Sequence, residues 1–133
     1  MLVKSIFSYH KETHTETLRL RLLDNGIVHY TYLLNSEIGE REHKLNHRTY
    51  VDFVENDKKM ILVDSEGYNS VSPEARKLIR SLEKIVPISK RAIVISTLHE
   101  RLLANFYITF HKPIIPTKIF KCYEEAFSWL KSN

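Results

Sequence analysis

Residues 60–79 read MILVDSEGYNSVSPEARKLI, and this stretch decides the fold class. Its first part, MILVD (60–64), is a short continuous apolar run ending in aspartate, as expected for a strand that is covered on both faces. Pro73 then begins an amphipathic helix. A buried strand followed by such a helix is typical of a parallel strand–helix–strand crossover, so the stretch predicts an α/β fold.

The helix that begins at Pro73 has clear start and stop signals. Ser72 is placed as its N-cap, Glu74 complements the helix dipole, and Pro87 ends it. The apolar residues that should face the core recur at helical spacing: Ala75, Leu78, Ile79, Leu82, Ile85 and Val86. The pattern therefore predicts a helix with one buried face.

A second strand and helix follow in the same order. RAIVIS (91–96) is another buried strand, and Thr97 with Glu100 three residues later matches a capping box. The prolines of KPIIP (112–116) then enforce an extended path. The residues expected to point inward from this second helix are Leu98, Leu102, Leu103, Phe106 and Phe110.

The chain continues with TKIFKC (117–122), a third short strand. The spacing of Tyr123, Ala126, Phe127 and Leu130 then predicts a closing helix. These three strand–helix pairs favour a sheet whose strands from this part of the chain run parallel.

The N-terminal part predicts a hairpin and a helix. TLRLRLL (17–23) alternates polar and apolar residues, Asn25-Gly26 supplies a turn, and IVHYTYLL (27–34) resumes the strand pattern. A ragged apolar stripe predicts a helix over about 40–55.

The predicted order is therefore hairpin–α–β–α–β–α–β–α. It forms one α/β domain over residues 1–133, with 1–16 as a lead-in and an antiparallel hairpin added to a mixed sheet.

The charge of the chain is uneven. Residues 1–72 carry 9 basic and 11 acidic side chains, a net −2, whereas residues 73–133 carry 11 basic and 5 acidic, a net +6. Such asymmetry can mark an anionic partner, although a solvated basic helix face explains it more simply. The basic residues lack interleaved aromatic side chains, so a nucleic-acid partner is not expected.

The cysteine count and the distribution of apolar residues indicate where in the cell the protein is expected. The single cysteine excludes an internal disulfide, and no apolar run approaches the ~20 residues that a membrane-spanning helix needs. The first residues turn polar too early for a signal peptide. A cytoplasmic protein is the expectation.

The element order and the loop after MILVD resemble the STAS domain, the module of anti-sigma-factor antagonists and sulphate-transporter tails. The resemblance covers residues 17–131, with Val63-Asp64 at the strand end and Ser70-Val71-Ser72-Pro73 at the helix start. The C-terminal half is similar to short, uncharacterised bacterial STAS-like or SpoIIAA-like proteins through Asn105-Phe106-Tyr107, Lys112-Pro113, Pro116-Thr117-Lys118, Phe120, Ala126 and Trp129-Leu130. The resemblance implies a SpoIIAA-like fold and a non-catalytic regulatory protein–protein interaction module.

One departure from the family pattern concerns its phosphorylation switch. In anti-sigma antagonists a serine that follows an aspartate at this helix start is phosphorylated, and by that alignment the aspartate becomes Ser72 and the serine becomes Pro73. Proline has no hydroxyl, so the usual phosphorylatable serine is missing. Ser70 or Ser72 could serve instead, since phosphate is favourable at a helix N-terminus, while Ser72 as a plain N-cap is the simpler interpretation.

Ligands of open parallel sheets gather outside the carboxyl ends of the strands. Our candidates for contacting a ligand or a partner there are Asp64, Ser65, Ser70 and Ser72 from the first junction, Ser96 and Thr97 from the second, and Asn105, Tyr107 and Lys112 further along. Capping and turn formation also explain the residues at the two junctions.

We expect neither catalysis, nor a metal, nor a cofactor. His43 and His47 have a spacing that can hold a metal, but the sequence identifies no third ligand. Ser65 does not stand in a nucleophile elbow, and Cys122 is explained as a small packed residue at a strand end.

Two functions stay open beside a weaker third, an enzyme whose residues converge only in three dimensions. The first is an interaction module that contacts an unidentified protein, with a homodimer also open. The second is a binding domain for a small anionic or lipid-like, amphipathic ligand. A cavity of ~300 Å³ or more lined by Asp64, Ser96 and Asn105 would favour the ligand, and a large exposed apolar patch would favour the protein.

Overall fold

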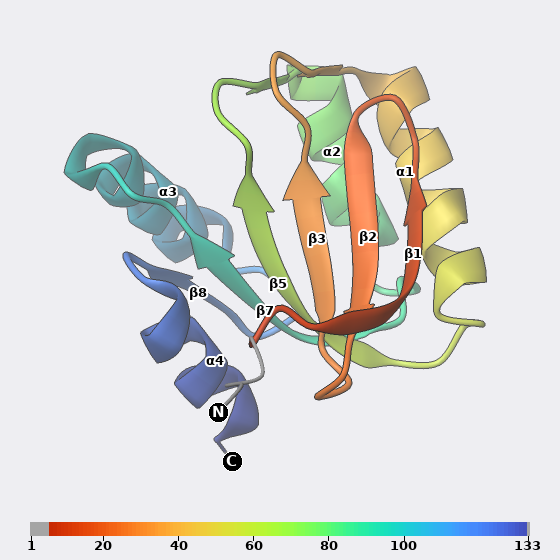
Figure 1. Cartoon of the computed structure of the whole chain (residues 1–133). Helices are drawn as coiled ribbons and strands as arrows, with labels where there is room; N and C mark the ends of the chain where they lie inside the picture. The colour runs from red at the N-terminus through yellow and green to blue at the C-terminus, as the bar shows by residue number, and fades with distance from the viewer. Residues whose placement is uncertain (1–5, 133) are drawn as a thin grey trace.

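The computed structural model describes residues 6–132, apart from the side chains of Tyr107 and Phe110. The helices are α1 (Glu40–Phe53), α2 (Pro73–Leu82), α3 (Leu98–His111) and α4 (Tyr123–Lys131) (Figure 1). The strands are β1 (Tyr9–His14), β2 (Leu18–Leu23), β3 (Val28–Tyr32), β4 (Glu37–Ile38), β5 (Lys59–Ser65), β6 (Ser70–Val71), β7 (Ile88–Val94) and β8 (Thr117–Phe120).

Six of the strands form one mixed sheet in the order β1-β2-β3-β5-β7-β8. The strands β1, β2 and β3 are antiparallel neighbours, whereas β3, β5, β7 and β8 run parallel. Ile61 of β5 lies opposite Arg91 of β7, so the two buried runs predicted first run side by side in the same direction. The predicted α/β class, mixed sheet and N-terminal hairpin are confirmed.

The predicted turn between β2 and β3 closes as its residue types require. Gly26 adopts a φ of +88°, a conformation that side chains rarely allow. Its N–H donates to the carbonyl of Leu23, and the Asn25 side chain accepts from the N–H of Ile27. This turn fixes the register that places alternate residues of β3 on each face of the sheet.

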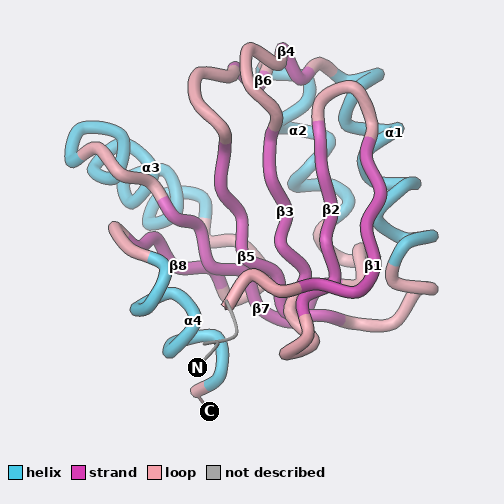
Figure 2. The backbone as a smooth tube through the Cα atoms, viewed as in Figure 1, coloured by secondary structure: helices cyan, strands magenta, loops and turns pink. Residues whose placement is uncertain are grey.

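Two features of the sheet lie outside the predicted order. Within the lead-in, Tyr9–His14 form the edge strand β1, whose polar sequence has no alternating pattern and whose side chains are mostly exposed. The two-residue strands β4 and β6 form a small parallel sheet of their own, beyond the carboxyl ends of β3 and β5 (Figure 2). Such short pairings leave no periodic signal in a sequence.

Helices cover the two faces of the sheet unequally. On one face, Tyr50 and Phe53 of α1 pack with Tyr30 and Ile61 of the sheet. On the other face, Phe127 and the rest of the apolar face of α4 pack on β5 and β7. The neighbouring residues Ile61 and Leu62 of β5 therefore belong to two separate apolar clusters, one on each face of the sheet.

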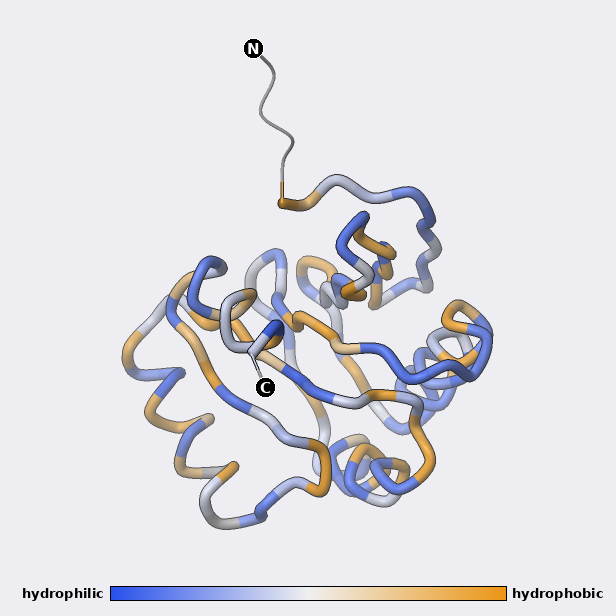
Figure 3. The backbone as a smooth tube through the Cα atoms, turned by 90° about the horizontal axis from the view of Figure 1, so that it is seen from below, coloured by the Kyte–Doolittle hydropathy of each residue, from blue (hydrophilic) through white to orange (hydrophobic). Residues whose placement is uncertain are grey.

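The prediction that α3 buries its apolar residues is wrong. Leu98, Leu102, Leu103 and Phe106 are between 59% and 68% exposed, and the helix projects from the β8 side of the sheet (Figure 1). Its sequence, LHERLLANFYITFH, has hydrophobic residues along its whole length, so their spacing does not single out a buried face. Figure 3 shows how hydrophobic and hydrophilic segments alternate along the chain. Phe110, also expected inward, has a side chain outside the described part of the structure.

Ile85, expected in the core, is 67% exposed because α2 ends at Leu82 and the helical periodicity stops there. Among residues 6–132, no helix is both long enough and apolar enough to cross a membrane.

Candidate functional site

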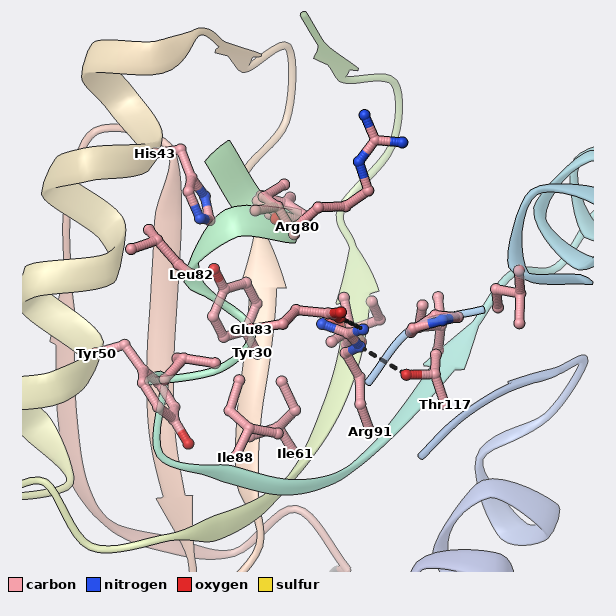
Figure 4. A pocket seen from close by; sticks show the side chains of 18 of the residues that line it. Tyr30, His43, Tyr50, Ile61, Arg80, Leu82, Glu83, Ile88, Arg91 and Thr117 are labelled. Carbon is pink, nitrogen blue, oxygen red and sulfur yellow. Dashed lines mark hydrogen bonds and ion pairs between the residues drawn. The ribbon is translucent and has the colours of Figure 1, made fainter. Parts of the chain in front are cut away.

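A pocket of about 480 Å³ lies on the sheet face that α1 and α2 only partly cover. Side chains of β3, β5 and β7 line it, including Val63 and Ile93. Tyr30 of β3 also lines it and is labelled in Figure 4. Val63 and Ile93 belong to interior strands but are only partly buried, because α3 does not close over them. An apolar surface therefore stays open between α2 and α3.

The rest of the pocket lining comes from three helices and several loops. Ile79 and Leu82 of α2 and Ile108 of α3 are among its apolar residues. Pro113 and Ile114, from the loop between α3 and β8, complete the lining. A mostly apolar wall with a few polar groups is the usual composition of a small-molecule site.

A buried ion pair braces the end of the pocket near the start of β7. The Arg91 guanidinium pairs with the carboxylate of Glu83, and its Nε donates to Thr117 Oγ1 at 3.1 Å (Figure 4). Glu83 also accepts from the backbone N–H of Ile114 at 3.1 Å. Since Glu83 follows α2, this network ties the α3–β8 loop to the end of that helix and fixes the wall of the pocket.

Two polar side chains that line the pocket lack partners within the described part of the chain. His43 of α1 is 7% exposed, and its Nδ1 makes no hydrogen bond there. The same is true of Nδ2 of Asn69, in the loop after β5. Buried polar atoms are normally paired, so two unpaired ones along the same cavity point to a missing partner.

The charge state of His43 follows from its position. Burial, with a smaller contribution from His47, lowers the pKa of the His43 imidazole to about 4. The ring is therefore neutral at neutral pH and carries a single N–H.

Basic groups stand at the rim of the pocket. Arg80 of α2 donates to Nδ1 of His111 in α3 at 3.0 Å, which links the two helices. Lys112 follows in the left-handed conformation, with φ 42°, and is exposed. Arg80, His111 and Lys112 all line the pocket and are exposed to solvent.

Asp64 borders the pocket, but its carboxylate belongs to the opposite face of the sheet. It accepts hydrogen bonds from Nε2 of His29 at 2.8 Å, from Oγ1 of Thr31 at 2.6 Å and from the hydroxyl of Tyr123 at 2.7 Å. Burial raises the pKa of Asp64, but these bonds outweigh it and hold the pKa below its ordinary value. The cluster joins β3, β5 and α4.

Tyr123 shows the complementary effect, since burial and the neighbouring Asp64 carboxylate raise the pKa of its hydroxyl. Phe7 packs edge-on against the Tyr123 ring and lies 5.0 Å from the His29 ring, centroid to centroid. The three donors, with the aromatic cover, leave the Asp64 carboxylate fully engaged inside the fold.

Only some of the residues predicted to contact a ligand or a partner line the pocket. Ser65 and Lys112 line the pocket with Asp64, whereas Ser96 and Asn105 do not. Ser70 lies in β6, and Tyr107 has a side chain outside the described part. The cavity is therefore large enough for the proposed ligand site, but only part of its predicted lining is present.

Two of the candidates act as helix caps. The Ser72 hydroxyl accepts from the N–H of Ala75 at 3.0 Å, and the Thr97 hydroxyl accepts from the N–H of Glu100 at 3.3 Å. The Ser96 carbonyl accepts from the Arg101 guanidinium at 2.7 Å. These contacts are those that a helix start requires.

The sequence did not indicate several residues of the pocket. The spacing of His43 and His47 indicates at most a metal ligand pair, and no sequence pattern marks Asn69, Glu83 or Arg91. In residues 6–132 no group of three or more His, Cys, Asp or Glu side chains is placed to hold a metal ion.

Comparison with known proteins supplies a family and a fold. The family model described as Domain of unknown function (DUF7793) matches residues 21–133. No curated protein matches. Among solved structures, the chain is similar to an uncharacterised protein from the DUF3478 family of Shewanella loihica PV-4, described as having a SpoIIAA-like fold, with 11% identity, a TM-score of 0.57, and coverage of 98% of this chain and 99% of that chain. The predicted SpoIIAA-like fold is confirmed.

Proposed function

The chain belongs to the family of a domain of unknown function, DUF7793, and we propose that it is a non-catalytic binding domain for a small amphipathic molecule. The observation that carries the proposal is the cavity of about 480 Å³ over the interior strands β5 and β7. This volume falls within the ~300–1,000 Å³ range of small-molecule pockets. A core position such as Val63 is normally covered by a helix, and here it faces the cavity.

The size and lining of the pocket define the class of ligand. At ~30 Å³ for each water molecule of the liquid, the volume equals that of about 16 water molecules, which is room for a molecule with roughly as many non-hydrogen atoms. The apolar floor suits a hydrocarbon body, and the polar groups of His43, Asn69 and Arg80 suit a polar end. A medium-chain amphiphile such as dodecanoate has both properties.

Calorimetric titration with dodecanoate tests the proposal. We expect saturable binding at one site, and we expect Val63→Phe or Ile93→Phe to weaken it by tenfold or more, because the added ring occupies the cavity. Ile85→Phe is the matched control, since Ile85 is exposed and outside the pocket. Absence of saturable binding to the unmodified protein, or equal loss in the control, would contradict the proposal.

The exposed apolar face of α3 favours a second candidate, the STAS-type regulatory protein–protein interaction module. Leu98 and Leu102 stand one turn apart on this face and are 63% and 61% exposed. Neighbouring large apolar side chains at such exposure are typical of a surface that another protein covers. In this candidate the partner is an unidentified protein, and the family's phosphorylation switch is missing because Pro73 stands at its serine position.

A further inference from the structure

We propose that the polar end of the bound molecule carries an acceptor oxygen, which His43 and Asn69 hold by hydrogen bonds. This inference rests on the proposed function and names the ligand class for that same pocket. It adds that the molecule enters with its hydrocarbon body over β5 and β7 and its acceptor toward the end of the pocket where α1 begins.

His43 provides the first contact. It lies one turn into α1, and Figure 4 shows its ring directed toward the cavity beside Leu82 and Tyr30. His43 is only 7% exposed, yet its Nδ1 has no hydrogen-bond partner among the described residues. A buried imidazole that lines a cavity and lacks a partner is poised to bond a group inside that cavity.

Asn69 provides the second contact, and the small β4–β6 sheet brings it to the same end of the pocket. Asn69 directly precedes β6, in which Ser70 lies opposite Glu37 of β4. The N–H of Ser70 also donates to the carbonyl of Ser36 at 3.0 Å. Because α1 starts two residues after β4, this pairing holds the Asn69 loop next to the first turns of α1.

The chemistry of the two groups selects an acceptor. The Asn69 amide nitrogen is a donor only. A neutral imidazole has one N–H donor and one acceptor nitrogen, and we assign the proton to Nδ1, the nitrogen that has no partner among the described residues. Burial keeps His43 in that neutral form at neutral pH. A carboxylate or ester oxygen satisfies both donors, whereas a quaternary ammonium group, which has neither an acceptor nor an N–H, satisfies none.

Three probes of equal chain length test this inference by competition or calorimetry: dodecanoate, methyl dodecanoate and dodecyltrimethylammonium. We expect dodecanoate to bind at least tenfold more tightly than dodecyltrimethylammonium, since two hydrogen bonds together contribute about a factor of ten. Methyl dodecanoate keeps an acceptor without the charge. If methyl dodecanoate binds more tightly than dodecyltrimethylammonium, the result also supports the inference and shows that a negative charge on the ligand is not required.

Variants then assign the preference to these two residues. In the double variant His43→Leu with Asn69→Leu, we expect the preference for dodecanoate to fall to near unity while the ammonium probe still binds. Asn69→Leu alone, in a loop, is expected to lower the preference about threefold and keeps the test available if the double variant does not fold. His14→Leu, at an exposed position of β1, is the matched control and should keep the full preference.

The outcomes separate this inference from the proposed function. Equal binding of all three probes, or a preference that survives in the double variant, would overturn the inference and leave the pocket as a ligand site. If no probe binds, the proposed function fails and the inference fails with it.

Discussion

His43 is a buried polar residue that lines the pocket. It reaches the pocket from α1, where a helix interior rarely leaves a polar atom without a partner. Its pKa of about 4 reflects burial first and the nearby His47 second. This residue therefore links the stability of the fold to pH as well as to the contents of the pocket.

The free energy of unfolding should fall as the pH is lowered from 6.5 toward 4. In this window the unfolded chain, whose histidine titrates near its ordinary 6.5, binds a proton that folded His43 does not. The stabilisation is thus fully present above the unfolded pKa and is lost as the pH falls toward the folded one. Its size is about 3 kcal/mol, from the linkage of ~1.4 kcal/mol per pKa unit.

Urea denaturation at pH 7, 5.5 and 4 measures this loss. His43→Leu should reduce the slope across the window, and His47, whose pKa burial also lowers, should retain part of it. His14→Leu, at an exposed position, should keep the slope of the unmodified protein. An unchanged slope in the His43 variant would show that other groups cause the pH dependence.

The sequence predicted Asp64 at the strand end but not what its side chain contacts. The alternation of β5 turns Val63 toward the pocket and Asp64 toward α4, where His29, Thr31 and Tyr123 meet it. Those partners are 33 to 59 residues away in the chain. No local pattern encodes such a convergence, so it becomes visible only in three dimensions.

At the scale of elements, the strands and helices could be predicted because their signals are local. Asn25-Gly26, the Ser72 cap and the apolar runs each act over a few residues. The packing of α3 could not be predicted from its sequence. Its apolar residues are not confined to one side of the helix, so the sequence does not show which side faces solvent. Its exposed side chains are consequently the strongest argument for a partner protein.

Substitution on α3 should separate the two candidate functions. In affinity purification from the native host, a protein partner that covers α3 should be captured by the unmodified chain and lost with Leu98→Asp and Leu102→Asp together. Ile85→Asp, also at an exposed apolar position, should retain the same protein. Loss in both variants, or retention in both, would argue against a partner on α3.

At the scale of the molecule, the site follows from how unevenly the helices cover the sheet. The helix α4 packs on one face, and α1 and α2 lie on the other (Figure 1). On that second face, Val63 of β5 and Ile93 of β7 line the pocket together with Ile108 of α3. Glu83, which is paired with Arg91, also accepts from a backbone N–H of the α3–β8 loop and so ties that loop to the end of α2. A matching fold in a protein with 11% identity shows that the architecture tolerates wide changes of sequence.

The most direct measurement of the central claim is a nuclear Overhauser experiment with methyl-labelled protein and dodecanoate. The account predicts contacts from the hydrocarbon chain to the methyl groups of Val63 and Ile93, with none to those of Leu98 or Ile85, which lie outside the pocket. Contacts confined to the exposed apolar residues of α3, with Val63 and Ile93 silent, would contradict it.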